Sequence, residues 1–357
     1  MTVLTMPAQP GQDAGQKPRP VPWPRMLWVT WRQQRATFIS VPAVLAAAAI
    51  LLVIFGLKAH HEYTALLNCR LDPGKQSGAC SQLMTKFNSG VWPLANVCSI
   101  LMDLVPVLLG AFAGAPLLAR ELETGTFRYA WTQGLRRERQ AIAKLVLVGL
   151  MLAVLAWAFS ELFAWFFQPF LWVEQLNQMS TEGVFDTRGL VFPAFTLVAF
   201  AIGAFLGMLL RRVVPALAAT LGVYLAIQLA AWGVRKYYPV AVVTGNSKIF
   251  SQFQTPSLPG YPWILSTWVT GPGGKQVSQS VASRLLNGPG PSGGTSVASG
   301  ASAPSAGGSV PPGYTEWNRW IPLSHYWPMQ FIEAGWLLVL AVALIAGTVW
   351  LVRHRAA

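Results

Sequence analysis

The chain has 357 residues, of which 53% are hydrophobic and only 11% are charged, and its formal net charge is +13. A soluble domain averages about 25% charged residues, so this composition excludes an ordinary soluble enzyme and a chain that is disordered throughout. In a soluble protein such a basic excess would indicate nucleic acid. Basic loops also orient membrane proteins, so the positions of the charges decide its meaning.

The N-terminal part predicts a tail followed by an interfacial helix. Residues 1–24 are rich in Pro, Gln and Gly, and we expect them to be disordered and cytoplasmic. Residues 25–35 are loosely amphipathic and include Trp28, Trp31 and Arg32, a pattern that suits a helix lying at the membrane interface. Simple anchoring of the first membrane span by Trp and Arg explains the same residues equally well.

Six segments have the length and apolar composition of a transmembrane helix, which needs about 20 residues. These segments are residues 38–57, 97–118, 145–165, 190–210, 213–232 and 331–352. The sequence therefore predicts an all-α membrane protein whose permease domain covers residues 25–357. Because only residues 211–212 separate the fourth and fifth spans, we expect these two helices to form a tight hairpin.

The basic residues are unevenly distributed across these spans. With a cytoplasmic N-terminus, the inside segments carry 15 Lys and Arg and the outside segments carry 11, six of them in the long stretch between the predicted spans 213–232 and 331–352. Long loops count little in the positive-inside rule. We therefore expect a multi-pass protein of the plasma membrane with both termini cytoplasmic, and the opposite orientation is the alternative.

The predicted external loop at residues 58–96 carries Cys69 and Cys80. An oxidising outside compartment favours a disulfide between them. Two free thiols are the alternative, because the spacing of two cysteines does not show whether the geometry closes.

The last external loop, residues 236–327, has two parts. Residues 237–287 contain several aromatic side chains, and we expect them to lie on the membrane surface or to dip into it. Residues 288–313 consist almost entirely of Gly, Ala, Ser and Pro and predict a flexible insert.

Motifs for catalysis, metal binding and nucleotide binding are missing from the sequence. Gly274 and Lys275 are followed by Gln276 and lack the upstream glycine of a phosphate-binding loop. We therefore assign no catalytic residue, no metal site and no cofactor to this chain.

Three carboxylates fall within or at the ends of the predicted spans: Asp103, Glu161 and Glu333. A carboxylate inside a membrane is costly and usually faces a protein interior or a water-filled cavity, so each predicts a substrate pathway or a pair with an Arg. Solvation near a membrane interface is the alternative, and it is strongest for Glu333 and Asp103. Glu161 lies deepest and is the preferred candidate.

Two pairs of glycines lie four residues apart within spans. Gly110 and Gly114 belong to the second span, and Gly203 and Gly207 belong to the fourth. Small residues at this spacing let helix backbones approach closely. The pairs predict tight packing without identifying the partner helix.

The predicted cytoplasmic loop at residues 119–144 has a pattern of its own. Gly125 suits the end of the helix that leaves the second span, and Thr126 suits the N-cap of a further helix of about two turns. Phe127 and Trp131 then share one face of that helix. A short capped helix with two aromatics indicates docking to a partner, and a helix lying flat on lipid headgroups is the alternative.

Residues 114–126, followed by Trp131-Thr132-Gln133-Gly134, resemble the actinobacterial branch of the type-two ABC-transporter permeases. Three further stretches agree with this family in the same order along the chain: residues 31–35, 211–216 and 322–333. The chain departs from the family at His325 and Tyr326, where Arg-Phe is usual. Its long external insert also departs from the family pattern, so the resemblance does not predict the shape of the external gate.

The resemblance implies an N-terminal connecting helix, six spans, and a coupling helix between the second and third spans. It implies that two membrane units associate with two P-loop ATPase subunits, which bind ATP and Mg, and that the coupling helix docks in a cleft of the ATPase. The connecting helix then contains Trp28, Trp31 and Arg32. The coupling region contains Arg120, Glu121, Glu123, Gly125, Thr126, Phe127, Arg128 and Trp131.

These features predict a permease that exports an amphipathic or hydrophobic compound, such as an antibiotic, peptide or lipid. The smallest complete machine has two copies of this chain, or one copy with a related permease, together with two ATPases. We expect Phe166, Phe167 and Trp172 to line the outer end of the pathway or to form an interface belt. A membrane-embedded enzyme and a membrane-anchored sensor or assembly protein are the alternatives, and co-purification of an ATPase distinguishes them.

Overall fold

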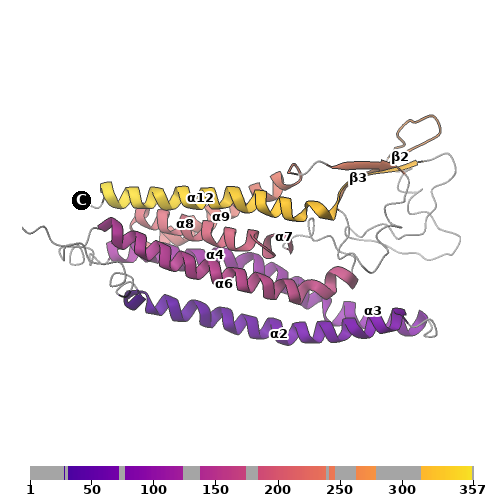
Figure 1. Cartoon of the computed structure of the whole chain (residues 1–357), viewed down its shortest axis with the longest axis horizontal. Coiled ribbons are helices and arrows are strands. Elements are labelled where there is room, and N and C mark those ends of the chain that lie inside the picture. The colour runs from indigo at the N-terminus through magenta and orange to yellow at the C-terminus, as the bar shows by residue number, and fades with distance from the viewer. Residues whose placement is uncertain are drawn as a thin grey trace, which may run out of the picture.

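The computed structural model describes residues 28, 31–71, 77–123, 137–173, 184–238, 241–245, 263–278 and 315–355. Long helices run side by side along the longest dimension of the molecule, and a small sheet lies at one end of them (Figure 1). We call this the sheet end of the bundle, and the opposite end, where the last helix finishes, the C-terminal end. The elements are α2 (Arg35–Leu71), α3 (Ser77–Gly90), α4 (Trp92–Glu123), α6 (Arg137–Val173), α7 (Val184–Thr187), α8 (Val191–Leu210), α9 (Val213–Arg235), β1 (Val242–Gly245), β2 (Trp263–Thr270), β3 (Thr315–Ile321), a 3₁₀ turn (Leu323–His325) and α12 (Tyr326–Arg355).

Six of the described helices are long and apolar enough to cross a membrane, which confirms the predicted number and order of spans. Several of them are longer than a bilayer requires. Helix α2 continues from Leu57 to Leu71 because residues 58–71 contain good helix formers and neither Gly nor Pro. Together with α3, this extension makes most of the expected external loop at 58–96 a helical hairpin.

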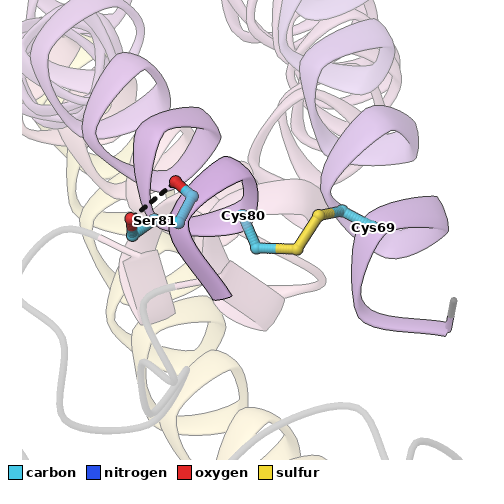
Figure 2. The surroundings of a disulfide bond; sticks show 4 residues. Cys69, Cys80 and Ser81 are labelled. Atoms are coloured by element: carbon cyan, nitrogen blue, oxygen red, sulfur yellow. Dashed lines mark hydrogen bonds between the residues drawn. A yellow bond between two sulfur atoms is a disulfide. The ribbon is translucent and has the colours of Figure 1, made fainter. Parts of the chain in front are cut away.

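A disulfide closes this hairpin at the sheet end (Figure 2). It joins Cys69 near the end of α2 to Cys80 in α3, with a Cα–Cα distance of 5.8 Å. Beside it, the hydroxyl of Ser81 donates a hydrogen bond of 2.8 Å to the carbonyl oxygen of Gly78. The third cysteine, Cys98, is free.

Helices α4 and α8 are packed backbone to backbone. A Cβ atom built on Gly110 would lie 2.4 Å from the Cβ atom of Ala199, and one built on Gly207 would lie 2.5 Å from the carbonyl oxygen of Ala115. Real side chains do not fit at such distances, so glycine is needed at these positions. This confirms the tight packing expected from the glycine pairs and identifies α4 and α8 as partners.

The turn between α8 and α9 is as tight as the sequence predicts. Arg211 has a φ of 55°, and its N–H donates to the carbonyl oxygen of Gly207 at 3.1 Å. This left-handed conformation ends α8. Arg212 is extended, and α9 begins directly after it at Val213.

The sheet was not predicted from the sequence. Its strand order is β1-β3-β2, with antiparallel pairing throughout, and Trp268 of β2 lies opposite Trp317 of β3. Strands β1 and β2 fall in the stretch 237–287, which we expected along the membrane surface. Because β1 follows α9 and β3 precedes α12, their pairing holds the sheet ends of these two helices together. The tail 1–24 and the insert 288–313 lie outside the described residues.

Candidate functional site

Three charged side chains meet inside the sheet end of the bundle: Asp186 of α7, Arg235 at the end of α9, and Glu333 of α12. The Nε of Arg235 donates to Glu333 Oε2 at 3.1 Å, and its Nη2 donates to Glu333 Oε1 at 2.9 Å. The same Nη2 also donates to Asp186 Oδ1. Glu333 is 0% exposed and Arg235 is 3% exposed. We call these three residues the buried ion cluster.

The geometry of the cluster offsets the cost of taking charges out of water. A buried ion pair is tolerated only when its geometry is good and its polar atoms are satisfied, and a bidentate Arg–carboxylate contact meets that condition. The guanidinium carbon of Arg235 also lies 4.2 Å from the ring centroid of Phe185, a cation–π contact. Burial raises the pKa of Asp186, and the charge and hydrogen bond of Arg235 oppose that rise. The cluster therefore holds α7, α9 and α12 together.

Helix α7 is only one turn long, and neighbouring helices fix its position. Gln330 of α12 donates from Nε2 to the carbonyl oxygen of Phe185 at 3.1 Å, and its Oε1 accepts from the N–H of Val191 at 3.1 Å. From α6, the hydroxyl of Ser160 donates to the carbonyl oxygen of Thr187 at 3.0 Å. These bonds place α7 between α6, α8 and α12, with Asp186 toward Arg235.

A second set of polar side chains lies close to the cluster. Burial lowers the pKa of Arg188, and the nearby Tyr326 and Glu161 oppose this lowering. Tyr326 also accepts a hydrogen bond of 3.4 Å from Gln330 Nε2. Glu161 itself is exposed on α6.

The three acids predicted from the sequence thus have different environments. Glu333, for which solvation was the stronger alternative, is buried and paired with an Arg. Glu161, the preferred candidate, lies on the surface of α6. Asp103 of α4 is partly buried and lies within electrostatic range of Tyr224.

The sequence reasoning missed two members of the cluster, Asp186 and Arg235. Asp186 lies in a short stretch between two spans and carried no motif. Arg235 lies one turn beyond the predicted end of the fifth span and was counted as an outside loop charge. The available signal was that only Gly233 and Val234 lie between the predicted span and Arg235, with no Pro and no polar residue, and the helix continues through them.

At the C-terminal end, the coupling region is described only at its edges. Glu123, the last residue of α4, accepts a hydrogen bond through Oε2 from the N–H of Val213 at 3.2 Å. Arg353 of α12 pairs with Glu138 of α6 at 3.2 Å, and Arg120 is exposed on α4. The remaining residues assigned to the coupling region lie outside the described residues or have side chains that do: Glu121, Gly125, Thr126, Phe127, Arg128 and Trp131.

The residues assigned to the connecting helix lie before α2. Residues 31–33 are helical, and the guanidinium carbon of Arg32 lies 5.8 Å from the ring centroid of Trp28. Trp31 packs against Phe38 of α2 with ring centroids 4.6 Å apart. Trp28 and Trp31 are exposed, which suits both an interfacial helix and simple anchoring.

Phe166 and Phe167 of α6 are buried inside the bundle, so the prediction that they line a pathway or form an interface belt is wrong for these two residues. Both are at most 1% exposed and pack with Phe170. Phe170 in turn contacts Phe87 of α3 with ring centroids 5.3 Å apart. These aromatics form the core between α6 and the α2–α3 hairpin, and the side chain of Trp172 lies outside the described residues.

The polar side chains of this site are engaged in contacts within the chain. Within the part of the chain that the structure describes, no group of three His, Cys, Asp or Glu residues is arranged to hold a metal ion. The two carboxylates of the buried ion cluster are already engaged by Arg235. The cluster therefore serves to hold helices in register.

The described residues contain six apolar helices that are long enough to span a membrane, among them the closely packed pair α4 and α8, and these define a multi-pass membrane protein. Residues 42–235 match the family described as ABC-2 membrane transporter related. This match covers more than half of the chain, and the chain belongs to that family, as its resemblance to type-two ABC permeases implied. The match runs from α2 to the end of α9, so the sheet and α12 lie outside it. No curated protein and no solved structure matches the chain.

Proposed function

We propose that this chain is the membrane-spanning permease subunit of an ATP-binding-cassette exporter and is not itself an enzyme. The observation that carries the proposal is the family match over residues 42–235, which includes the loop between α4 and α6 where the coupling helix is expected. ATP and Mg then bind to separate P-loop ATPase subunits, which dock on that loop. The exported compound is amphipathic or hydrophobic, such as an antibiotic, a peptide or a lipid.

The complete transporter contains two permease units and two ATPase subunits in this proposal, with two copies of this chain as the simplest arrangement. The pathway then lies between the two permease units. Six of the described helices can span a membrane, and with this even number both termini lie on the same side of the plasma membrane, which we propose to be the cytoplasm.

Two features, one at each end of the bundle, support this orientation. The C-terminal end carries exposed basic residues, including Arg120, Arg211, Arg212 and Arg353, as cytoplasmic segments do. The sheet end carries the Cys69–Cys80 disulfide, which suits an oxidising compartment outside the cell.

Co-purification tests the partner. A tagged full-length chain purified from membranes should retain a P-loop ATPase that mass spectrometry identifies. The double variant Phe127→Ala and Trp131→Ala should lose it, and Phe112→Ala, which truncates an exposed aromatic on α4, should keep it. Purification of the wild-type chain without any ATPase would contradict the proposal, and so would full retention by the double variant.

Labelling with a membrane-impermeant maleimide tests the orientation. In a Cys98→Ala background, a cysteine introduced at the exposed Thr267 of β2 should react in intact cells, and one introduced at the exposed Arg353 should react only after permeabilisation. The reverse pattern would show that the termini lie outside.

A further inference from the structure

The first turn of α9 is capped by a residue from a different helix. Arg212, the N-cap position of α9, makes no side-chain cap of its own. Instead, Glu123 Oε2 accepts the hydrogen bond of the Val213 N–H at 3.2 Å. The first N–H groups of a helix have no partner within the helix, and a carboxylate there is favoured by both hydrogen bonding and the helix dipole. We call this bond the Glu123 latch.

The position of Glu123 in the chain gives the latch its importance. Glu123 ends α4, and residues 124–136, which join α4 to α6, begin directly after it. We call residues 124–136 the coupling segment. Glu123 therefore stands directly before the coupling segment and at the same time contacts the N-terminus of α9.

Helix α9 connects the latch to the buried ion cluster. It has 23 residues and is continuous from Val213 to Arg235, so it extends for about 35 Å at 1.5 Å per residue. Arg235 at its far end is bound by Glu333 and Asp186. A helix of this length transmits a shift of one end to the other unless its backbone hydrogen bonds break.

A second contact, at the same end of the bundle, joins α6 to α12. Glu138, at the start of α6 just after the coupling segment, pairs with Arg353 of α12 at 3.2 Å. Helix α12 carries Glu333 at its sheet end. Helices α9 and α12, which both contribute to the buried ion cluster, are thus contacted at their other ends by Glu123, just before the coupling segment, and by Glu138, just after it.

We infer that Glu123 is a positioning residue that links the coupling segment to α9 and, through α9, to the buried ion cluster at the sheet end. The latch joins exposed or partly exposed groups, which can exchange their hydrogen bond with water, whereas the cluster is buried. The inference rests on the proposed function only for the agent that moves the coupling segment. The mechanical link itself belongs to this chain alone.

Hydrogen exchange of the full-length chain in lipid nanodiscs, without any ATPase, tests this link. Glu123→Leu removes the acceptor, and Val213→Pro removes the donor while placing Pro at the first helical position, where it is favoured. Each variant should speed exchange in residues 231–238 by about threefold or more, as expected when a net hydrogen bond is lost from a cooperative unit. Glu123→Gln keeps an acceptor oxygen and should leave exchange near the wild-type rate.

The double variant Glu123→Leu and Val213→Pro should exchange no faster than the single variants, because both changes remove the same bond. Faster exchange confined to residues 213–217, with 231–238 unchanged in both single variants, would overturn the inference. Additive effects of the two changes at 231–238 would also overturn it. If one variant does not fold, the other still decides, since they alter opposite partners. Absence of an ATPase would overturn the proposed function and leave this result untouched.

Discussion

The two ends of the helix bundle are held by contacts of opposite character. At the sheet end, Arg235 is enclosed with Asp186 and Glu333, and a disulfide and a sheet reinforce neighbouring elements. At the C-terminal end, the pair of Glu138 and Arg353 is 41% and 69% exposed. Breaking a buried ion pair leaves an uncompensated charge, whereas an exposed pair exchanges readily with water. The elements of the sheet end are therefore held together by buried contacts, whereas the exposed contacts of the C-terminal end, where an ATPase is proposed to act, can rearrange more easily.

The buried ion cluster provides the largest expected effect. Arg235→Gln leaves Glu333 and Asp186 buried without a cation and should lower the free energy of unfolding by about 3–5 kcal/mol. Thermal unfolding of the purified chain in detergent measures the loss. Lys236→Gln removes the neighbouring, exposed cation and should change the free energy of unfolding by less than about 0.5 kcal/mol. Equal stability of the two variants would show that the buried ion cluster does not stabilise the sheet end.

The disulfide provides the second effect. Its cysteines are 11 residues apart in sequence, and a bridge that closes a loop of this size stabilises by roughly 2–3 kcal/mol. The double variant Cys69→Ser and Cys80→Ser should therefore unfold at a lower temperature than the oxidised wild-type chain. Reductant should lower the unfolding temperature of the wild type and leave the double variant unchanged. A reductant effect of the same size on both proteins would assign it to some other cause.

The α4–α8 contact, which runs between the two ends, provides the third effect. Gly110→Ala forces a Cβ atom to within 2.4 Å of Ala199 and should lower the free energy of unfolding by about 1–3 kcal/mol through overpacking. Gly222→Ala on α9 is the matched control, because its Cβ atom meets nothing within 4 Å. Thermal unfolding of both variants measures the difference. Helix propensity alone favours Ala over Gly at both positions, so an equal change in the two variants would show that the close contact with Ala199 does not contribute to stability.

The exposed pair at the C-terminal end provides the smallest effect. Glu138→Gln removes its charge and should lower the free energy of unfolding by less than about 1 kcal/mol. That small difference should shrink at high salt, because exposed charges are screened. Unfolding of this variant at low and high salt tests both statements. A loss as large as that of Arg235→Gln would mean that the two ends are equally rigid.

Much of the fold could be predicted because its signals are local in sequence. A span is a continuous apolar run, and the four-residue spacing of Gly110 and Gly114 marks a close helix contact wherever its partner lies. The hairpin at Arg211 followed from the short distance between two spans. Each of these features depends on residues that are neighbours along the chain.

The buried ion cluster could not be predicted in the same way. Asp186, Arg235 and Glu333 come from three elements that are far apart in the sequence. No sequence pattern around any one of them indicates that the other two lie beside it. The direction of a side chain around a helix raised the same difficulty for Glu161 and Phe166, since hydropathy does not show which face of α6 packs inward. The sheet also depends on strands separated by a long insert.

The central claim is that nucleotide bound by a separate ATPase at the C-terminal end changes the structure at the sheet end. Hydrogen exchange of residues 231–238 and 326–334 in the purified permease–ATPase complex tests it most directly, compared without nucleotide and with ATP and vanadate. We predict that trapping with nucleotide changes exchange in both stretches, and that Glu123→Leu abolishes the change while the ATPase stays bound. Exchange that changes only in the ATPase and at the C-terminal end would contradict the account.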